Sequence, residues 1–142
     1  MKSSRFSLLG LLWILLAFVS ACATPPPTTA AGFKAAAKAK SDKDDYNGAI
    51  ADYTKAIALG ATDPATYYAR GSAEEAKGDL DGAIADYSQV IALDPNNAEA
   101  YNDRGFAKES KGDLDGAAAD LNQAAKLTSP QPSRCSPDGL AI

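Results

Sequence analysis

A seven-residue sequence, Lys-Gly-Asp-Leu-Asp-Gly-Ala, occurs at residues 77–83 and again at 111–117, so the two copies lie 34 residues apart. A weaker copy, at residues 45–49, precedes the first by about the same interval. A fixed period of this length is typical of solenoids, in which each unit buries its apolar face against its neighbours. The period therefore predicts a stacked array that presents a surface.

Each unit reads as two helices, most clearly at residues 64–97. Asp63 before Pro64 indicates a helix start, because an acid caps the helix and proline fits its first position. Gly78 is predicted to end the first helix, because glycine readily adopts the left-handed backbone conformation found at many helix ends. Either Asp79 or Asp81 can cap the second helix. The second helix then carries apolar residues at helical spacing: Ala83, Ile84, Tyr87, Val90 and Ile91.

Aromatic and small residues recur in phase in the three units. The second unit has Tyr67, Gly71, Ala83, Tyr87, Val90 and Pro95; the third has Tyr101, Gly105, Ala117, Leu121 and Ala124; the first has Phe33, Ala37, Ala49, Tyr53 and Ala56. This order resembles that of the tetratricopeptide repeat family. The resemblance implies an all-α fold, a short α-solenoid of three helix-turn-helix units at residues 30–63, 64–97 and 98–131. It further implies that Gly71 and Gly105 lie at helix crossings faced by alanines, with aromatics filling the remaining volume.

Charged residues also follow the period. Arg70 and Arg104 are equivalent, with Ala36 at that place in the first unit, and acids recur on the second helices at Asp52, Asp86 and Asp120. Two pairings are open: within units, which leaves Asp52 beside Ala36, or between units, as Arg70–Asp52 and Arg104–Asp86. The second is favoured because it leaves one unmatched residue at each end. Lys40, Glu74 and Lys108 stand where the family usually has an aromatic residue.

Residues 1–21 have the features of a bacterial lipoprotein signal peptide. Lys2 and Arg5 precede an apolar run over residues 8–19, which is short for a membrane span. The run ends in Val19-Ser20-Ala21-Cys22, which resembles the lipobox. That resemblance implies lipidation of the Cys22 thiol and cleavage just before it. The alternative is a general secretory signal in which Cys22 is incidental. Ala23, in place of an aspartate, favours the outer membrane.

Two segments flank the predicted repeat domain at residues 33–129. Residues 22–32 contain three consecutive prolines and are predicted to be an extended linker after the lipidated cysteine. Residues 130–142 are rich in proline and serine and are predicted to be a disordered tail. Cys135 lies in that tail, either as an inert thiol or paired with a second chain.

Composition argues against several classes of function. The chain contains no histidine, which removes the commonest general base and metal ligand. Its net charge of −4 argues against nucleic acid as a partner. The Gly-Asp-Leu-Asp segments lack the ligand ladder of a calcium loop and are better explained as helix caps. We therefore expect no enzyme activity, no cofactor and no metal.

The family resemblance implies that the first helix of each unit lines a concave peptide groove. Carried over by position, the groove residues are Lys34, Lys38, Ser41, Tyr68, Ser72, Glu75, Asn102, Phe106 and Glu109. This groove is expected to be basic near the tether and acidic far from it, with Phe106 as an apolar anchor. Lys34 fits the family's clamp for a terminal carboxylate, but four other positions do not, so chaperone-type recognition is not expected. The four are Lys38, Ala69, Glu99 and Asp103.

These features predict a lipid-anchored interaction module, a scaffold or adaptor of the bacterial cell envelope. Its partner would be an envelope protein or peptide held in the groove, such as a peptidoglycan enzyme, a protease or a secretion component. The alternative is a structural subunit of an envelope or secretion complex, assembled through the solenoid ends.

Overall fold

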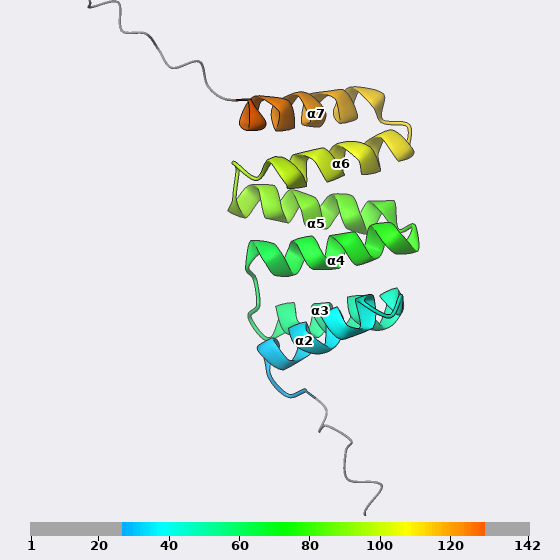
Figure 1. Cartoon of the computed structure of the whole chain (residues 1–142), viewed down its shortest axis with the longest axis vertical. Coiled ribbons are helices and arrows are strands. Elements are labelled where there is room, and N and C mark those ends of the chain that lie inside the picture. The colour runs from blue at the N-terminus through cyan, green and yellow to red at the C-terminus, as the bar shows by residue number, and fades with distance from the viewer. Residues whose placement is uncertain (1–26, 130–142) are drawn as a thin grey trace, which may run out of the picture.

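The computed structural model describes residues 27–129, and the residues on either side lie outside that description. Over this range the chain forms six α-helices: α2 (Ala30–Ser41), α3 (Tyr46–Ala58), α4 (Pro64–Lys77), α5 (Leu80–Leu93), α6 (Ala98–Ser110) and α7 (Leu114–Thr128). They pack as three successive pairs, α2 with α3, α4 with α5 and α6 with α7 (Figure 1). The predicted all-α solenoid of three helical pairs is confirmed.

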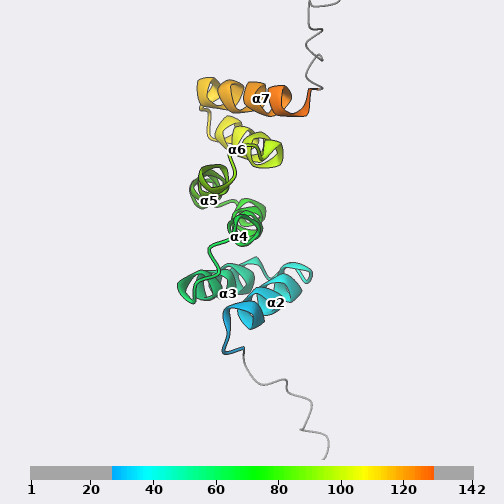
Figure 2. The same cartoon turned by 90° about the vertical axis from the view of Figure 1, so that its left-hand side faces the viewer.

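The pairs stack because each second helix also contacts the first helix of the next pair, as α3 does α4 and α5 does α6. First helices also meet, since α2 contacts α4. Figure 2 shows α2 and α4 toward one side of the stack, with α3 and α5 toward the other. Among the described residues no helix is long and apolar enough to cross a membrane.

The second helices share one start signal, an aspartate that accepts a hydrogen bond from a glycine amide three residues on. The pairs are Asp45 with Gly48 at 3.0 Å, Asp79 with Gly82 at 3.2 Å and Asp113 with Gly116 at 3.0 Å. The glycines are needed at two of these places, because a Cβ at Gly48 or Gly116 would lie 2.2 Å from Oδ2, the second oxygen of the capping carboxylate. Asp79, not Asp81, is therefore the cap, and the acidic turns are helix caps as predicted.

The core is built mainly from alanine, and its largest fully buried side chains are Tyr87, Val90 and Thr66. Gly71 and Gly105 lie at close helix crossings. A Cβ at Gly71 would lie 3.1 Å from the Tyr87 ring, and one at Gly105 would lie 3.0 Å from Leu121. The nearest side chains thus include Tyr87 and Leu121, one turn beyond Ala83 and Ala117 on the second helices, and the Ala117 carbonyl also lies 3.4 Å from the Gly105 position.

Each helix pair buries one aspartate of its second helix, and the preferred prediction for its partner is wrong. Arg70 pairs with Asp86 and Arg104 with Asp120, so both ion pairs lie within a unit. The reason lies in the first unit. Lys40, one turn beyond Ala36, reaches Asp52 at 2.6 Å, so within-unit pairing leaves none of the three buried aspartates without a cation.

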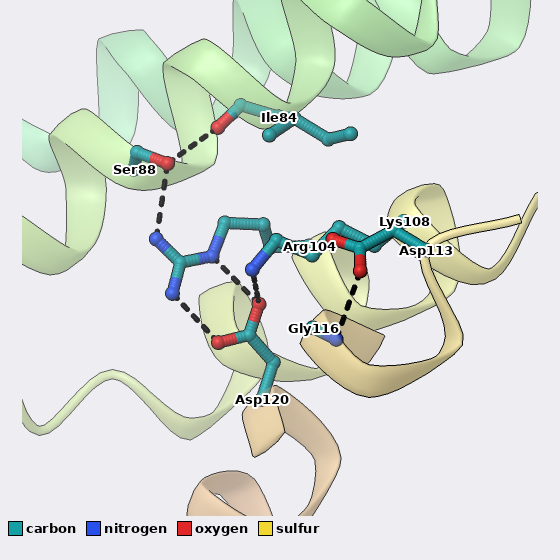
Figure 3. Close-up of polar contacts among 7 residues, drawn as sticks. All are labelled: Ile84, Ser88, Arg104, Lys108, Asp113, Gly116 and Asp120. Atoms are coloured by element: carbon teal, nitrogen blue, oxygen red, sulfur yellow. Dashed lines mark hydrogen bonds and ion pairs between the residues drawn. The ribbon is translucent and has the colours of Figure 1, made fainter. Parts of the chain in front are cut away.

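The arginines still link the units, through a different group. Arg104 Nη1 donates to the Ser88 hydroxyl of the preceding pair at 3.0 Å, and Ser88 in turn donates to the Ile84 carbonyl at 2.6 Å (Figure 3). Arg70 Nη1 makes the same bond to Thr54 at 3.1 Å. Each arginine thus closes its own helix pair and contacts the one before it.

Candidate functional site

A hollow of about 460 Å³ lies between the first two helix pairs. Its walls come from α2, the middle and end of α4, and two tyrosines of α3. The lining residues are Lys38, Ser41, Asp42, Tyr46, Tyr53, Tyr68, Ala69, Ser72, Ala73 and Ala76. Of the predicted groove residues, Lys38, Ser41, Tyr68 and Ser72 therefore meet at one surface. Small side chains on α4 leave the hollow open, and the tyrosines give it an aromatic wall.

The two predicted groove lysines are neutralised by carboxylates. Lys34 Nζ lies 2.9 Å from Asp63, the residue that caps α4, and Lys38 Nζ lies 3.3 Å from Asp42. The hydrogen bond from Lys34 is the main reason that the pKa of Asp63 falls to about 2. The expected basic end of the groove is therefore not basic, because each amine faces an acid that the repeat pattern did not reveal.

Tyr68 connects the second and third units. Its hydroxyl donates to Asp103 of α6, and its ring centroid lies 5.6 Å from that of Tyr87. The Tyr87 hydroxyl donates to Glu75 Oε2 at 2.8 Å. Burial, followed by the adjacent carboxylates, raises the pKa of both tyrosines, so both hydroxyls remain hydrogen-bond donors.

The three predicted groove residues on α6 lie elsewhere. Asn102 lines a second hollow of about 640 Å³ at the α7 end of the array, with Ala98, Glu99, Leu121, Ala124, Ala125 and Thr128. Phe106 is 47% exposed and Glu109 is exposed, and neither lines either of these two hollows. By register they occupy on α6 the places of Ser72 and Glu75 on α4, one period earlier.

Several residues at this surface were missed by sequence reasoning. Asp103 was considered only as a mismatch to the carboxylate clamp, yet it receives the Tyr68 hydroxyl. Tyr46 and Tyr53 belong to a second helix, which the family pattern assigns to the core and not to the groove. Their spacing of two helical turns on α3 was the available signal, since it puts both rings on one face.

The predicted packing residues divide into two groups. Ala49, Tyr53, Gly71, Ala83, Tyr87, Gly105 and Ala117 are buried. The first-helix aromatics Phe33, Tyr67 and Tyr101 are half-buried beneath cations, with Lys55, Arg70 and Arg104 at 5.4, 6.0 and 5.6 Å from the respective ring centroids. The proposed lipidation residue, Cys22, lies outside the described residues.

Sequence comparison agrees with this architecture. A family description of a TPR repeat matches residues 71–112, and one of a tetratricopeptide repeat matches residues 98–130. This chain is a tetratricopeptide repeat (TPR) protein. The matches overlap the second and third helix pairs. No curated protein sequence matches the chain.

Several solved structures resemble this chain over about 70% of its length. A MamA crystal structure is 30% identical with a TM-score of 0.67, over 70% of this chain and 58% of that one. The chain thus spans little more than half of the MamA chain. The TPR domain of Arabidopsis OM64 is 29% identical with a TM-score of 0.66, over 70% and 83% of the two chains. The first TPR domain of Spaghetti (RPAP3), bound to the HSP90 peptide SRMEEVD, is 25% identical with a TM-score of 0.66, over 70% and 79%.

Proposed function

We propose that this TPR protein is a lipid-anchored adaptor of the bacterial cell envelope that recruits a partner protein through its first-helix face. The tyrosine-walled hollow between α2, α3 and α4 carries the proposal. TPR domains are protein-protein interaction modules, and the RPAP3 relative was solved with a bound peptide. A concave surface with an aromatic wall and a few polar groups is the usual form of a ligand-binding site. Recruitment of this kind requires no catalytic group on this chain.

The envelope location rests on the sequence. Val19-Ser20-Ala21-Cys22 supports lipidation at Cys22, and Ala23 supports the outer membrane with the repeats facing the periplasm. Two or more acyl chains give stable anchoring where one does not. The TPR array would then be held near the bilayer by the proline-containing segment that precedes α2.

Site-specific crosslinking in intact cells tests the proposal. A photoreactive residue replaces Ser72, which is exposed and lines the hollow. We expect one dominant crosslinked protein, and we expect Tyr68→Ala combined with Phe106→Ala to abolish it while helicity and membrane association persist. Leu93→Ala combined with Leu114→Ala is the matched control, because both leucines are exposed on second helices. The proposal is wrong if the control pair abolishes the crosslink and the aromatic pair does not.

A second candidate function is assembly through the end of the array. The hollow at α6 and α7 favours it, because a following helix pair could pack there as α6 packs against α5. Charged substitution at exposed Ala125 should then disperse the assembly in a sedimentation measurement. Partner capture could persist in the Tyr68 and Phe106 variant and be lost when Ala118 and Ala125 are substituted. That result would favour assembly through the end of the array over binding in the groove.

A further inference from the structure

Carboxylates outnumber amines on the first-helix face of the array. The acids on or beside this face are Asp42, Glu75, Glu99, Asp103 and Glu109; the bases are Lys34 and Lys38. Both bases are engaged, by Asp63 and Asp42. Within residues 27–129, Glu75, Glu99, Asp103 and Glu109 make no ion pair. The middle and far parts of this face therefore carry uncompensated negative charge.

Two of these acids are fixed in place by the tyrosine pair. Tyr68 binds Asp103 Oδ2 and Tyr87 binds Glu75 Oε2, while the two rings pack against each other. Each acid thus uses one oxygen to hold its position. Glu75 Oε1 has no hydrogen-bond partner among the described residues, and Asp103 Oδ1 has only a long contact of 3.4 Å from Asn102. One free oxygen from α4 and one from α6 remain beside an aromatic surface.

An amine or guanidinium is the group that satisfies such an arrangement. Cations bind carboxylate oxygens through charge-assisted hydrogen bonds, and they also lie favourably against tyrosine rings. Tyr68 also lines the hollow, where the Ser41 hydroxyl is buried with no hydrogen-bond partner in the described part of the chain. Phe106 follows Asp103 by three residues on α6, so an apolar surface accompanies the charge.

We propose that the partner inserts an arginine or lysine side chain between Glu75 and Asp103, and that this TPR face selects cationic segments. The inference rests on the proposed function, because it names the partner class for the same face. The peptide in the RPAP3 complex, SRMEEVD, ends in acidic residues. A peptide of that charge would meet like charges here, which disfavours binding.

Peptide binding by the full chain in detergent micelles tests the charge preference directly. Three fluorescein-labelled amidated peptides share one phenylalanine and differ only in their flanking residues, which are arginine, glutamine or glutamate. Fluorescence anisotropy should show the arginine peptide binding about tenfold more tightly than the glutamine peptide, a difference that corresponds to about 1.4 kcal/mol. The glutamate peptide should bind most weakly, and added salt should reduce the arginine preference.

Isosteric variants then locate the effect. Glu75→Gln with Asp103→Asn keeps an oxygen for each tyrosine hydroxyl while removing both charges, so the arginine preference should fall to near one. Asp115→Asn, an exposed acid of α7, removes a charge away from this face and should leave the preference unchanged. The inference is overturned if the three peptides bind alike or not at all, or if Asp115→Asn lowers the preference as much as the double variant.

The outcome is separable from that of the proposed function. Suppose that the Tyr68 and Phe106 variant loses the cellular crosslink, and that the Glu75 and Asp103 variant changes neither the crosslink nor peptide binding. This result supports the groove function and rejects the cationic partner. Retention of the crosslink in both variants rejects the groove itself.

Discussion

Arg70 holds Asp86 through two parallel hydrogen bonds of 2.7 Å, from Nε to Oδ2 and from Nη2 to Oδ1. Bidentate pairing satisfies both oxygens of a side chain that is only 4% exposed. Arg104 treats Asp120 in the same way, with bonds of 2.8 and 2.6 Å. The surroundings differ, however. Lys108 also reaches Asp120 at 2.8 Å, whereas the equivalent position near Asp86 holds Glu74.

Loss of the arginine should therefore cost more in the second unit than in the third. Arg70→Ala leaves Asp86 buried without a described cation, and breaking such a pair costs about 3–5 kcal/mol of unfolding free energy. Arg104→Ala leaves Lys108 on Asp120 and should cost about 1–2 kcal/mol less. Urea unfolding of residues 27–129, followed by circular dichroism, measures both.

The control removes the difference between the units. Arg104→Ala combined with Lys108→Ala strips Asp120 of both cations and should match the loss seen for Arg70→Ala. Equal losses for the two single arginine variants would show that Lys108 contributes nothing to holding Asp120.

Glu74 should make the protein less stable as pH rises from about 4.5 to about 7. Burial, and then repulsion from Asp86, raises the pKa of Glu74 from 4.5 to about 7. The folded state therefore keeps a proton that the unfolded state releases, so stability is greatest below pH 4.5 for this group and is lost through pH 7. Glu74→Gln should flatten this slope and add about 2–3 kcal/mol above that range.

The matched control for the pH slope is Glu109→Gln, an exposed acid on the corresponding first helix. Unfolding measured across pH should keep the wild-type slope in this variant.

At acid pH the dependence of stability on pH has the opposite sign. The pKa of Asp63 is lowered to about 2 by Lys34, so that contribution is present above pH 3.8 and is lost as pH falls toward 2. Unfolding free energy that does not decline between about pH 4.5 and 7 would contradict the role given to Glu74.

Enlarging a crossing glycine should also destabilise the array. A Cβ at Gly105 would already lie 3.0 Å from Leu121 Cγ, so Gly105→Leu overfills the contact at a cost of about 1–3 kcal/mol or more. Thermal unfolding followed by circular dichroism should show a sharply lower midpoint. Ala119→Leu adds the same side chain at an exposed position of α7 and should change the midpoint little. An unchanged midpoint in Gly105→Leu would remove the crossing role.

Lipidation is tested at the cysteine itself. Cys22→Ser should leave a mostly uncleaved precursor without lipid, because modification of the cysteine precedes cleavage in the lipoprotein pathway. Metabolic labelling with a fatty acid and gel mobility report both steps. Cys135→Ser is the control and should be labelled like the wild type. Processing of Cys22→Ser at the same bond, with equal membrane binding, would reject the lipobox interpretation.

The repeat signals predict the fold because each acts locally. Asp63 caps α4 and Gly78 ends it in the left-handed conformation, with a φ of 88°, as their spacing indicates. Charge pairing is different, because it depends on which turn of a neighbouring helix lies opposite. The sequence prediction compared Ala36 with Arg70 and did not consider Lys40 as a partner. The long Lys40 side chain, one turn further along α2, reaches Asp52.

The binding face was predicted less completely for the same reason. Tyr68 and Ser72 follow from position within the repeat, and both line the hollow. The neutralisation of Lys34 by Asp63 and the contact of Tyr68 with Asp103 join residues 29 and 35 positions apart. No periodic signal marks either contact, because each joins one helix pair to the start or the first helix of the next.

The hydroxyl that accepts a hydrogen bond from each arginine makes the two ends of the array unequal as places where a helix pair could be added. Thr54 and Ser88 each accept a bond from the unit that follows, and Asn122 stands at the next equivalent place. A gene duplication that copied residues 64–97 in tandem would supply both halves of this link at once, so the new junction would need no compensating substitutions. Ala36 carries no such donor, so an added unit before α2 would find one half missing. The array can therefore gain a helix pair more readily on its carboxyl side than before α2.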